Sequence, residues 1–519
     1  MGDPEKDSNM GMLEEKLLIK NISGINGDEE EAAKKEVGQV HGSAAAAGTT
    51  ASHTSWRRCL RTFTEEVKRV GYLAGPMVAV TFSQYMMQVI SIMIVGHLGK
   101  LALSSTAIAV SLSGVTGFSI LLGMAGALET LSGQAYGAEQ YHILGNQTRT
   151  AIFCLNLCCL PLSLLWLNVE KLLILAGQDP LISHGAGKFA KHLIPSLFAY
   201  ATLQPLIRFF QMQSLVVPML VSSIATLLFH IPVCWMLVYK SGLGNLGAAL
   251  AINLSYWVNV IFFALYIKFS PVCTKTWGHI SMEMFNGVGE FFRFAVPSAM
   301  MVCLEWWSYE LLVLLSGLLP NPQLETSVLS VCLSTIGTLY TIPYGLGAAG
   351  STRVSNEIGA GNPRAAQVAV YATVFLTIAE TSIVSTSLFF GRRAFGYIFS
   401  DDKEVVDYVT RMAPLVCLSV ILDSVQGALS GIARGCGWQH IGAFVNLGAF
   451  YLCGIPIAVV LAFWVKIRGM GLWIGIQSGA FVQNLLLAII TSRINWERQA
   501  SKARERIFEG SYSTDSGLF

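Results

Sequence analysis

Residues 72–95 read YLAGPMVAVTFSQYMMQVISIMIV, an apolar stretch without a charged side chain. A helix needs roughly 20 predominantly apolar residues to cross the hydrocarbon of a bilayer. Eleven further stretches of about this length follow along the chain. They lie at 103–128, 150–169, 189–207, 215–239 and 246–269 in the first half, and at 294–319, 328–350, 367–390, 405–433, 441–465 and 470–491 in the second. The pattern predicts an all-α integral membrane protein with twelve transmembrane helices.

The composition argues against a soluble protein. Hydrophobic residues make up 53% of the chain and charged residues only 13%, whereas soluble proteins carry about a quarter charged residues. The net charge of +2 gives no reason to expect a nucleic-acid partner. The chain contains no Walker A, HExxH or GxSxG sequence, and its eleven cysteines form no CxxC pair. We therefore expect neither an enzyme nor an ATP-driven pump, and neither a metal site nor an organic cofactor.

The placement of Lys and Arg predicts the orientation of the chain. Basic residues crowd the first span and follow the last, which places both termini in the cytosol. The basic residues are Arg57, Arg58, Arg61, Lys68 and Arg69 at one end, and Arg493, Arg498, Lys502, Arg504 and Arg506 at the other. The predicted domains are a cytosolic disordered tail (1–64), a first six-helix bundle (65–270), a cytosolic linker (271–290), a second bundle (291–493) and a cytosolic C-terminal tail (494–519).

The two halves of the chain carry matching features when the sequence is shifted by a little over 220 residues. The segment 134–138, QAYGA, matches 356–360, NEIGA, and each is expected in the polar loop after the second helix of its half. Because each half has an even number of spans, the repeats should be parallel, as two pseudo-symmetric bundles. A cleft between such bundles can open alternately to either side, which favours secondary active transport. The alternative is an inherited duplication without a rocking motion.

Acidic residues inside the predicted spans are rare, because a charge at the centre of a membrane helix costs about 2.5 to 3.5 kcal/mol. Glu305 and Glu310 lie in the seventh span and Asp423 in the tenth, and Glu380 in the ninth is a weaker candidate. Burial in a low dielectric favours the neutral form of a carboxyl group, so a proton gradient can change its occupancy. Proton and organic cation would then compete for one cavity. The alternative is that each acid accepts a hydrogen bond and only fixes helix packing.

The spacing within the seventh span separates its two acids. Glu305 and Glu310 point about 140° apart on a helix, so we expect only one of them to line the cavity. Aromatic residues nearby could hold an aromatic or cationic substrate by stacking and cation–π contact. The candidates are Trp306, Trp307, Tyr309, Tyr340 and Tyr344, each of which could instead serve packing or interface anchoring.

Several longer motifs carry a resemblance to a known family. They are VGHLG at 95–99, ETLSGQAYGA at 129–138, CLEWW at 303–307, IPYGLGAAGSTRVSNEIGAGNP at 342–363, LSGIARGCGWQHIGA at 429–443 and GLWIG at 471–475. With these motifs the chain resembles the multidrug and toxic compound extrusion (MATE) transporters, and looks most like their plant detoxification-type branch. The resemblance implies two six-helix bundles around a V-shaped central cavity and export of organic compounds in exchange for H⁺ or, less expected here, Na⁺.

The resemblance also carries roles to single residues. The family's acidic positions in the seventh and tenth helices correspond to Glu305, in its CLEWW setting, and Asp423, in its ILDSVQ setting. Many bacterial members place an Asp toward the end of the first helix, where this chain has Ser91. A cation site in the first bundle is therefore in doubt, although Gln84 and Gln88 could supply polar contacts there. We expect Glu305 and Asp423 to couple proton and substrate, and the protein to act as a monomer.

The cargo and the membrane are less constrained by the resemblance. The buried carboxylates favour an organic cation, a plant secondary metabolite or a xenobiotic over citrate. Alternatives on the same architecture are a lipid flippase, a carrier of flavonoid conjugates or other organic anions, and a channel. The expected membrane is the vacuolar or the plasma membrane, and residues 14–19, EEKLLI, form an acidic dileucine pattern that resembles sorting signals for vacuolar or endosomal membranes.

Overall fold

The computed structural model describes residues 47–278, 282–392 and 403–515, with the side chains of 47–56, 283 and 509–515 left aside. The chain forms two compact units, one up to Phe63 and one from Thr64 onward. The dileucine pattern and most of the predicted tail lie outside the described residues. The rest of that tail is helical, because α3 runs from Ala47 to Gly96. The predicted boundary at residue 64 lies within this helix.

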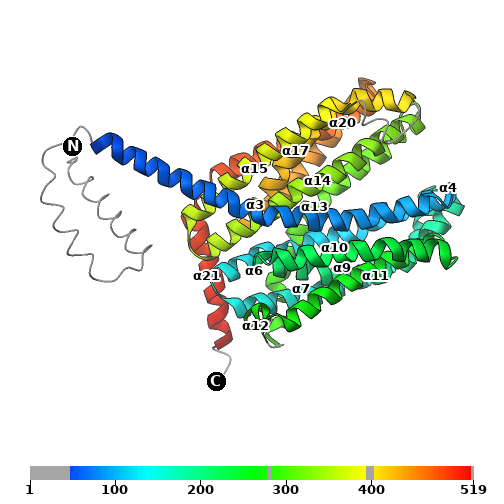
Figure 1. Ribbon diagram of the computed structural model, residues 1–519. Coiled ribbons are helices and arrows are strands. Elements are labelled where there is room, and N and C mark those ends of the chain that lie inside the picture. The colour runs from blue at the N-terminus through cyan, green and yellow to red at the C-terminus, as the bar shows by residue number, and fades with distance from the viewer. Residues whose placement is uncertain (1–46, 279–281, 393–402, 516–519) are drawn as a thin grey trace, which may run out of the picture. The chain divides into compact units, whose positions relative to one another are not determined.

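The described residues include twelve helical runs long and apolar enough to cross a membrane, which confirms the predicted fold class (Figure 1). The first six are α3, the run α4 (Lys100–Ser113), η2 (Gly114–Phe118), α5 (Ser119–Ala125) and α6 (Ala127–Gly137), then α7 (Tyr141–Leu167), α9 (Pro180–Met212), α10 (Val216–Trp235) with η3 (Met236–Lys240), and α11 (Asn245–Phe269). A short α8 (Val169–Leu175) precedes α9, and α12 (Pro271–Trp277) and η4 (Met282–Phe285) lie in the linker.

The second six spans repeat this plan. They are α13 (Val288–Ser316), α14 (Pro322–Gly359), α15 (Pro363–Phe390), α17 (Lys403–Cys436), the run α18 (Gln439–Asn446), η5 (Leu447–Gly454), α19 (Ile455–Val459) and η6 (Val460–Trp464), and α20 (Gly469–Ser492). A further helix, α21 (Trp496–Asp515), follows the last span. It packs on α14 and α15 of the second half and on α6 of the first (Figure 1).

The second span of each half is longer than its apolar run. The segments 134–137 and 356–359, predicted as loops, are the last turns of α6 and α14. Their polar side chains do not end the helices because they find partners on facing helices. Gln134 Nε2 donates to the carbonyl of Gly435 at 3.0 Å, and Asn356 Nδ2 donates to the carbonyl of Met212 at 3.1 Å. The two bonds are related by the same shift that relates the halves.

Close packing between the halves follows this symmetry. A Cβ added to Gly137 would clash with the backbone of Asn356, and a Cβ added to Gly359 would clash with the backbone of Gln134. Contact of residue i with j′ and of j with i′ is the mark of a two-fold interface. A glycine is required at both positions because another helix backbone occupies the space of a side chain. The last turns of α6 and α14 thus hold the two halves together at one end of the spans.

The pairs that lie deeper between the halves obey the same rule. A Cβ on Gly123 would lie 2.6 Å from Ala299 Cα, and a Cβ on Gly345 would lie 2.7 Å from the backbone nitrogen of Val78. Small residues of this kind let membrane helices approach closely. Gly345 therefore allows α14 to approach α3 closely.

Candidate functional site

A cavity of about 400 Å³ lies between the first six and the last six spans. The first half contributes side chains from α3, α4, η2, α5, α9 and α11, and the second half from α13, α14 and α17. The cavity brings together most of the candidates from the sequence, and these residues are Gln84, Gln88, Glu305, Trp306, Tyr309, Glu310, Tyr340, Tyr344 and Asp423. Residues that are far apart along the chain therefore share one site, although their roles in it stay predictions.

Glu305 is held by a short chain of hydrogen bonds from the second half. Gln426 Nε2 donates to Glu305 Oε2 at 2.6 Å and lies 3.0 Å from Ser430 Oγ. The hydroxyl of Tyr340 donates to Gln426 Oε1 at 3.1 Å. Gln426 contacts the Glu305 carboxyl group through its amide nitrogen and the Tyr340 hydroxyl through its amide oxygen. It therefore fixes the carboxyl group relative to the aromatic wall. Gln426 was not predicted from the sequence, and its position three residues after Asp423 puts it on the same side of α17.

Asp423 has one partner and one open oxygen. The hydroxyl of Tyr309 donates to Asp423 Oδ1 at 3.2 Å. The second oxygen, Oδ2, is buried and has no hydrogen-bond partner among the described residues. A buried polar atom without a partner is costly in an apolar interior. The open oxygen is thus available to a proton, a water molecule or a ligand.

Glu310 lines the same cavity as Glu305, so the expectation that only one of them does is wrong. The angle of about 140° between them is right for a helix, but α13 presents that whole arc to the cavity. Trp306 and Tyr309 lie at intermediate angles and also line it. Across the cavity, Ser111 Oγ of α4 donates to Glu310 Oε1 at 3.2 Å.

Aromatic rings line the cavity from both halves, and those of α14 form an aromatic wall on the side of the second half. Tyr340 and Tyr344 lie one turn apart on α14, with ring centroids 6.2 Å from each other. Tyr85, Tyr200 and Tyr256 of the first half line the cavity as well. Such rings can contact a flat or cationic ligand by stacking and cation–π attraction. Trp307, by contrast, is not among the lining residues, and its Nε1 donates to the carbonyl of Val115 at 3.1 Å.

The first half offers neutral polar groups to the cavity. Gln204 Nε2 donates to Gln84 Oε1 at 3.4 Å, while Gln84 Nε2 is buried without a partner among the described residues. Ser91 instead lies in a packed polar group, with its Oγ 3.0 Å from His230 Nε2. His230 Nδ1 lies 2.9 Å from Ser255 Oγ, and the imidazole is fully buried. His230 therefore has partners on both ring nitrogens, as expected of a packing histidine.

A buried group of three charges beside the cavity was missed from the sequence. Glu129 of α6 lies between two guanidinium groups, with Oε1 3.1 Å from Arg208 Nη1 of α9 and Oε2 2.9 Å from Arg434 Nε of α17. Arg208 also donates to the hydroxyl of Tyr344 at 2.7 Å and lines the cavity. We call these three residues, Glu129, Arg208 and Arg434, the charge triad. The triad joins the two halves next to the close contacts of α6 and α14.

The remaining acid, Glu380, lies on α15 and is not among the residues that line the cavity. Its two carboxyl oxygens are buried. Glu380 is therefore an intramembrane acid outside the site, which makes it a matched reference for Glu305 and Asp423.

Comparison with known proteins identifies the family. The MatE family profile matches residues 76–236 and 297–460, one match in each half of the chain. Protein DETOXIFICATION 12 of Arabidopsis thaliana is 62% identical over 445 residues, which cover 86% of this chain and 92% of that protein. Protein DETOXIFICATION 13 of Arabidopsis thaliana is 60% identical over the same shares of both chains.

Solved structures agree with this result. The crystal structure of the eukaryotic MATE transporter AtDTX14 has a TM-score of 0.84 and 59% identity, and the match covers 86% of this chain and all of that one. An outward-facing multidrug resistance MATE family transporter of the MOP superfamily has a TM-score of 0.73 at 15% identity, with 86% and 97% coverage, which supports the fold. These relatives are transporters and not enzymes. The chain belongs to the multidrug and toxic compound extrusion family of multi-pass membrane transporters, in its plant detoxification branch.

Proposed function

We propose that this transporter is a proton-coupled antiporter that moves organic cations, plant secondary metabolites or xenobiotics out of the cytosol. Glu305 and Asp423 are the groups that exchange proton for substrate, with Glu310 as a further acid of the same cavity. The observation that carries the proposal is that three carboxyl groups from α13 and α17 face one cavity of about 400 Å³ with an aromatic wall. A cation that enters there meets negative charge and stacking surfaces together.

The chemistry of exchange follows from the surroundings of the two acids. Deprotonated, Glu305 and Asp423 attract a cation, and protonated, they lose that attraction. Gln426 and Tyr309 each donate a hydrogen bond to one carboxyl oxygen, and Asp423 Oδ2 is open. The protein therefore offers one fixed oxygen and one exchangeable oxygen at Asp423. The driving ion in this scheme is the proton, with no further cofactor.

The proposed orientation places the contacts of α6 and α14 on the cytosolic side. Basic residues concentrate at that end, in the first part of α3 and along α21. This distribution is expected of cytosolic segments. Both termini are then cytosolic, and substrate leaves toward the vacuole or the cell exterior. The protein works as a monomer, because each half supplies one wall of the cavity.

One observation favours a second candidate function, the carriage of organic anions such as flavonoid conjugates. The charge triad holds two guanidinium groups against one carboxylate. Arg208, which lines the cavity, therefore belongs to a group with one surplus positive charge. An anionic cargo would contact this side of the cavity rather than the side that carries Glu305.

The test is uptake of a fluorescent organic cation into proteoliposomes with an acidic interior. We expect wild type to accumulate the dye and a protonophore to abolish accumulation. Glu305→Gln and Asp423→Asn should each reduce accumulation to background, because a neutral amide cannot release a proton. Glu380→Gln is the matched control, since it removes an intramembrane acid outside the cavity, and it should transport like wild type.

The outcomes separate the candidate functions. Normal transport by both Glu305→Gln and Asp423→Asn would contradict the coupling role, even in a working transporter. Accumulation of an anionic flavonoid glucuronide but not of the cation, with loss in Arg208→Gln, would favour the organic-anion carrier. Equilibration of the dye without accumulation against a gradient would indicate a channel.

A further inference from the structure

A second, polar cavity lies outside the transport site, at the end of the second half where α13 and α18 begin. Its volume is about 540 Å³, and it is bounded by α13, the end of α17, the turn before α18, the start of α18, and α21, with one residue from α6. Three basic residues line it, and they come from two elements: Arg293 from α13, and Lys502 and Arg506 from α21. None of the described lining residues is acidic. We call this the basic pocket.

The positive charge of the basic pocket is only partly compensated. The carboxylate of Glu290 lies beside it, with Oε1 3.8 Å from Arg506 Nε, and both side chains are partly exposed. Burial lowers the pKa of Arg506, and the nearby Arg293 lowers it further while Glu290 opposes this change. The carboxylate of Glu290 therefore stands against three cationic side chains in the pocket, so the positive charge is in excess. A pocket with surplus positive charge is suited to an anion.

Neutral groups of the pocket fit the same kind of ligand. Phe294 contributes an aromatic wall, with the Arg506 guanidinium 5.0 Å above its ring. Helix α18 begins at Gln439. The backbone N–H of Gly442 donates a hydrogen bond to the carbonyl of Trp438 at 3.0 Å. The amides before Gly442 are at the start of a long helical run, where backbone N–H groups favour negative charge.

The pocket lies at the edge of the lipid-facing surface. On α13, Val296 and Met300 are three and seven residues beyond Arg293 and are about half exposed, at 48% and 47%. On α18, Phe444 is four residues beyond His440 and is 73% exposed. Residues three, four and seven apart share a helix face, and large exposed apolar side chains on a membrane span face lipid tails. The pocket thus lies where the exposed apolar faces of α13 and α18 end, at the level of the lipid headgroups.

We propose that the basic pocket binds the phosphate headgroup of an anionic phospholipid from the leaflet at that side, with its acyl chains along the exposed faces of α13 and α18. Arg293 and Lys502 contact the phosphate, and Arg506 is oriented by it. Arg506 also donates a hydrogen bond from Nη2 to Gln134 Oε1 of the first half. A bound headgroup therefore orders a side chain that connects α21 to both halves.

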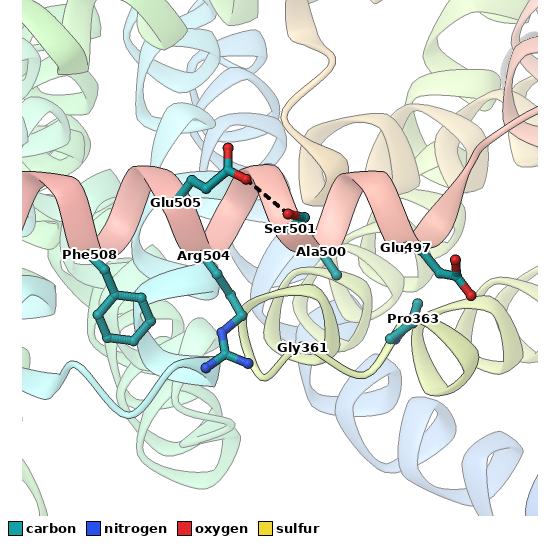
Figure 2. A pocket seen from close by; sticks show the side chains of 8 residues that line it. All are labelled: Gly361, Pro363, Glu497, Ala500, Ser501, Arg504, Glu505 and Phe508. Carbon is teal, nitrogen blue, oxygen red and sulfur yellow. Dashed lines mark hydrogen bonds between the residues drawn. The ribbon is translucent and has the colours of Figure 1, made fainter. Parts of the chain in front are cut away.

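The opposite face of α21 supplies a matched control. Figure 2 shows Arg504 pointing toward the turn at Gly361 and Pro363 between α14 and α15, and Arg504 is not among the residues that line the basic pocket. Residues 502 and 504 lie about 200° apart on a helix. Arg504→Gln therefore removes one positive charge from the same helix and leaves the basic pocket unchanged.

The experiment measures lipid binding to the purified full-length protein in detergent by native mass spectrometry. The probes are dioleoyl phosphatidic acid and, as a zwitterionic reference, dioleoyl phosphatidylcholine. We expect wild type to retain phosphatidic acid in preference, and Arg293→Gln/Lys502→Gln to weaken its binding roughly tenfold or more, since each cation near the surface contributes to the attraction. Lys502→Gln alone changes an exposed residue and should weaken binding by a smaller factor, and Arg504→Gln should bind like wild type.

Three results would overturn the assignment. These are equal retention of phosphatidylcholine, unchanged binding by both Lys502→Gln and the double variant, and an equal loss in Arg504→Gln. Competition with glycerol 3-phosphate and with inorganic phosphate distinguishes the source of the anion. If either competes at a concentration comparable to the lipid, the pocket takes a free phosphate and the lipid assignment is wrong. The readout needs no transport, so it is independent of the proposed function.

Discussion

The charge triad makes a prediction about stability that depends on counting charges. Glu129 is fully buried, and the side chains of Arg208 and Arg434 are only 3% and 8% exposed. Glu129→Gln would leave two buried guanidinium groups without a counter-charge. Breaking a buried ion pair by removing one partner costs about 3–5 kcal/mol. Arg434→Gln would instead leave Arg208 paired with Glu129, so its cost is a lost charged hydrogen bond, about 1.5–3 kcal/mol.

The assay is thermal unfolding of the purified variants in the same detergent. For a cooperative unit of several hundred residues, the unfolding entropy converts about 1 kcal/mol into a shift of about 1 °C in Tm. We expect Glu129→Gln to lower Tm by roughly 3–5 °C and Arg434→Gln by roughly half as much. A larger drop for Arg434→Gln than for Glu129→Gln, or an unchanged Tm for Glu129→Gln, would refute the charge count.

Three further predictions concern other parts of the molecule. Gly137→Ala should lower Tm, because the added methyl group meets the backbone of Asn356. Cys59, the one exposed residue among the eleven cysteines, should react with a membrane-impermeant maleimide in sealed vesicles only where their cytosolic face points outward. Glu170 has a lowered pKa because of the hydrogen bond from His184. Its stabilising effect should be complete above the ordinary pKa of 4.5 and disappear as the pH falls through the lowered value, so Glu170→Gln should lower Tm more at pH 7 than at an acidic pH below 4.5.

Each of these measurements has its own control. Gly71→Ala is matched to Gly137→Ala, because it is also a helical glycine but has open space around it, and it should keep or raise Tm. An equal loss in both would remove the packing argument. Cys59→Ser should abolish maleimide labelling, and labelling from the opposite face would reverse the proposed topology. For Glu170→Gln, a Tm difference of the same size at both pH values would rule out the ionised carboxylate as its cause.

The spans and most of the cavity could be predicted from the sequence, for a common reason. A membrane helix requires a long apolar run, and an acid within such a run stands out because it is costly there. Glu305 and Asp423 were found in this way, and both line the cavity. Gln426, which holds Glu305, could not be found, since a neutral amide in a span is not unusual and its partner is on another helix.

The charge triad escaped prediction for a related reason. The predicted spans end at residues 128, 207 and 433, and the next residue in each case is Glu129, Arg208 or Arg434. Hydropathy along the chain treats each charge as exposed to lipid, so it ends the span there. In the folded protein the three charges compensate one another across both halves, and the helices continue past them. The compensation of these buried charges involves three helices that are distant along the chain, so the sequence of any one helix does not reveal it.

The crossed contacts of α6 and α14 have a consequence for the origin of the chain. Gly133 and Ser355 occupy equivalent positions in the two repeats, and a Cβ on Gly133 would meet the side chain of Ser355. A residue that faces its own equivalent lies on the two-fold axis, so in a dimer of identical six-span units it would have faced its own copy. Only a small side chain fits twice in that space. Fusion of the two copies into one chain removed this restriction, because a Gly on one side leaves room for a Ser on the other.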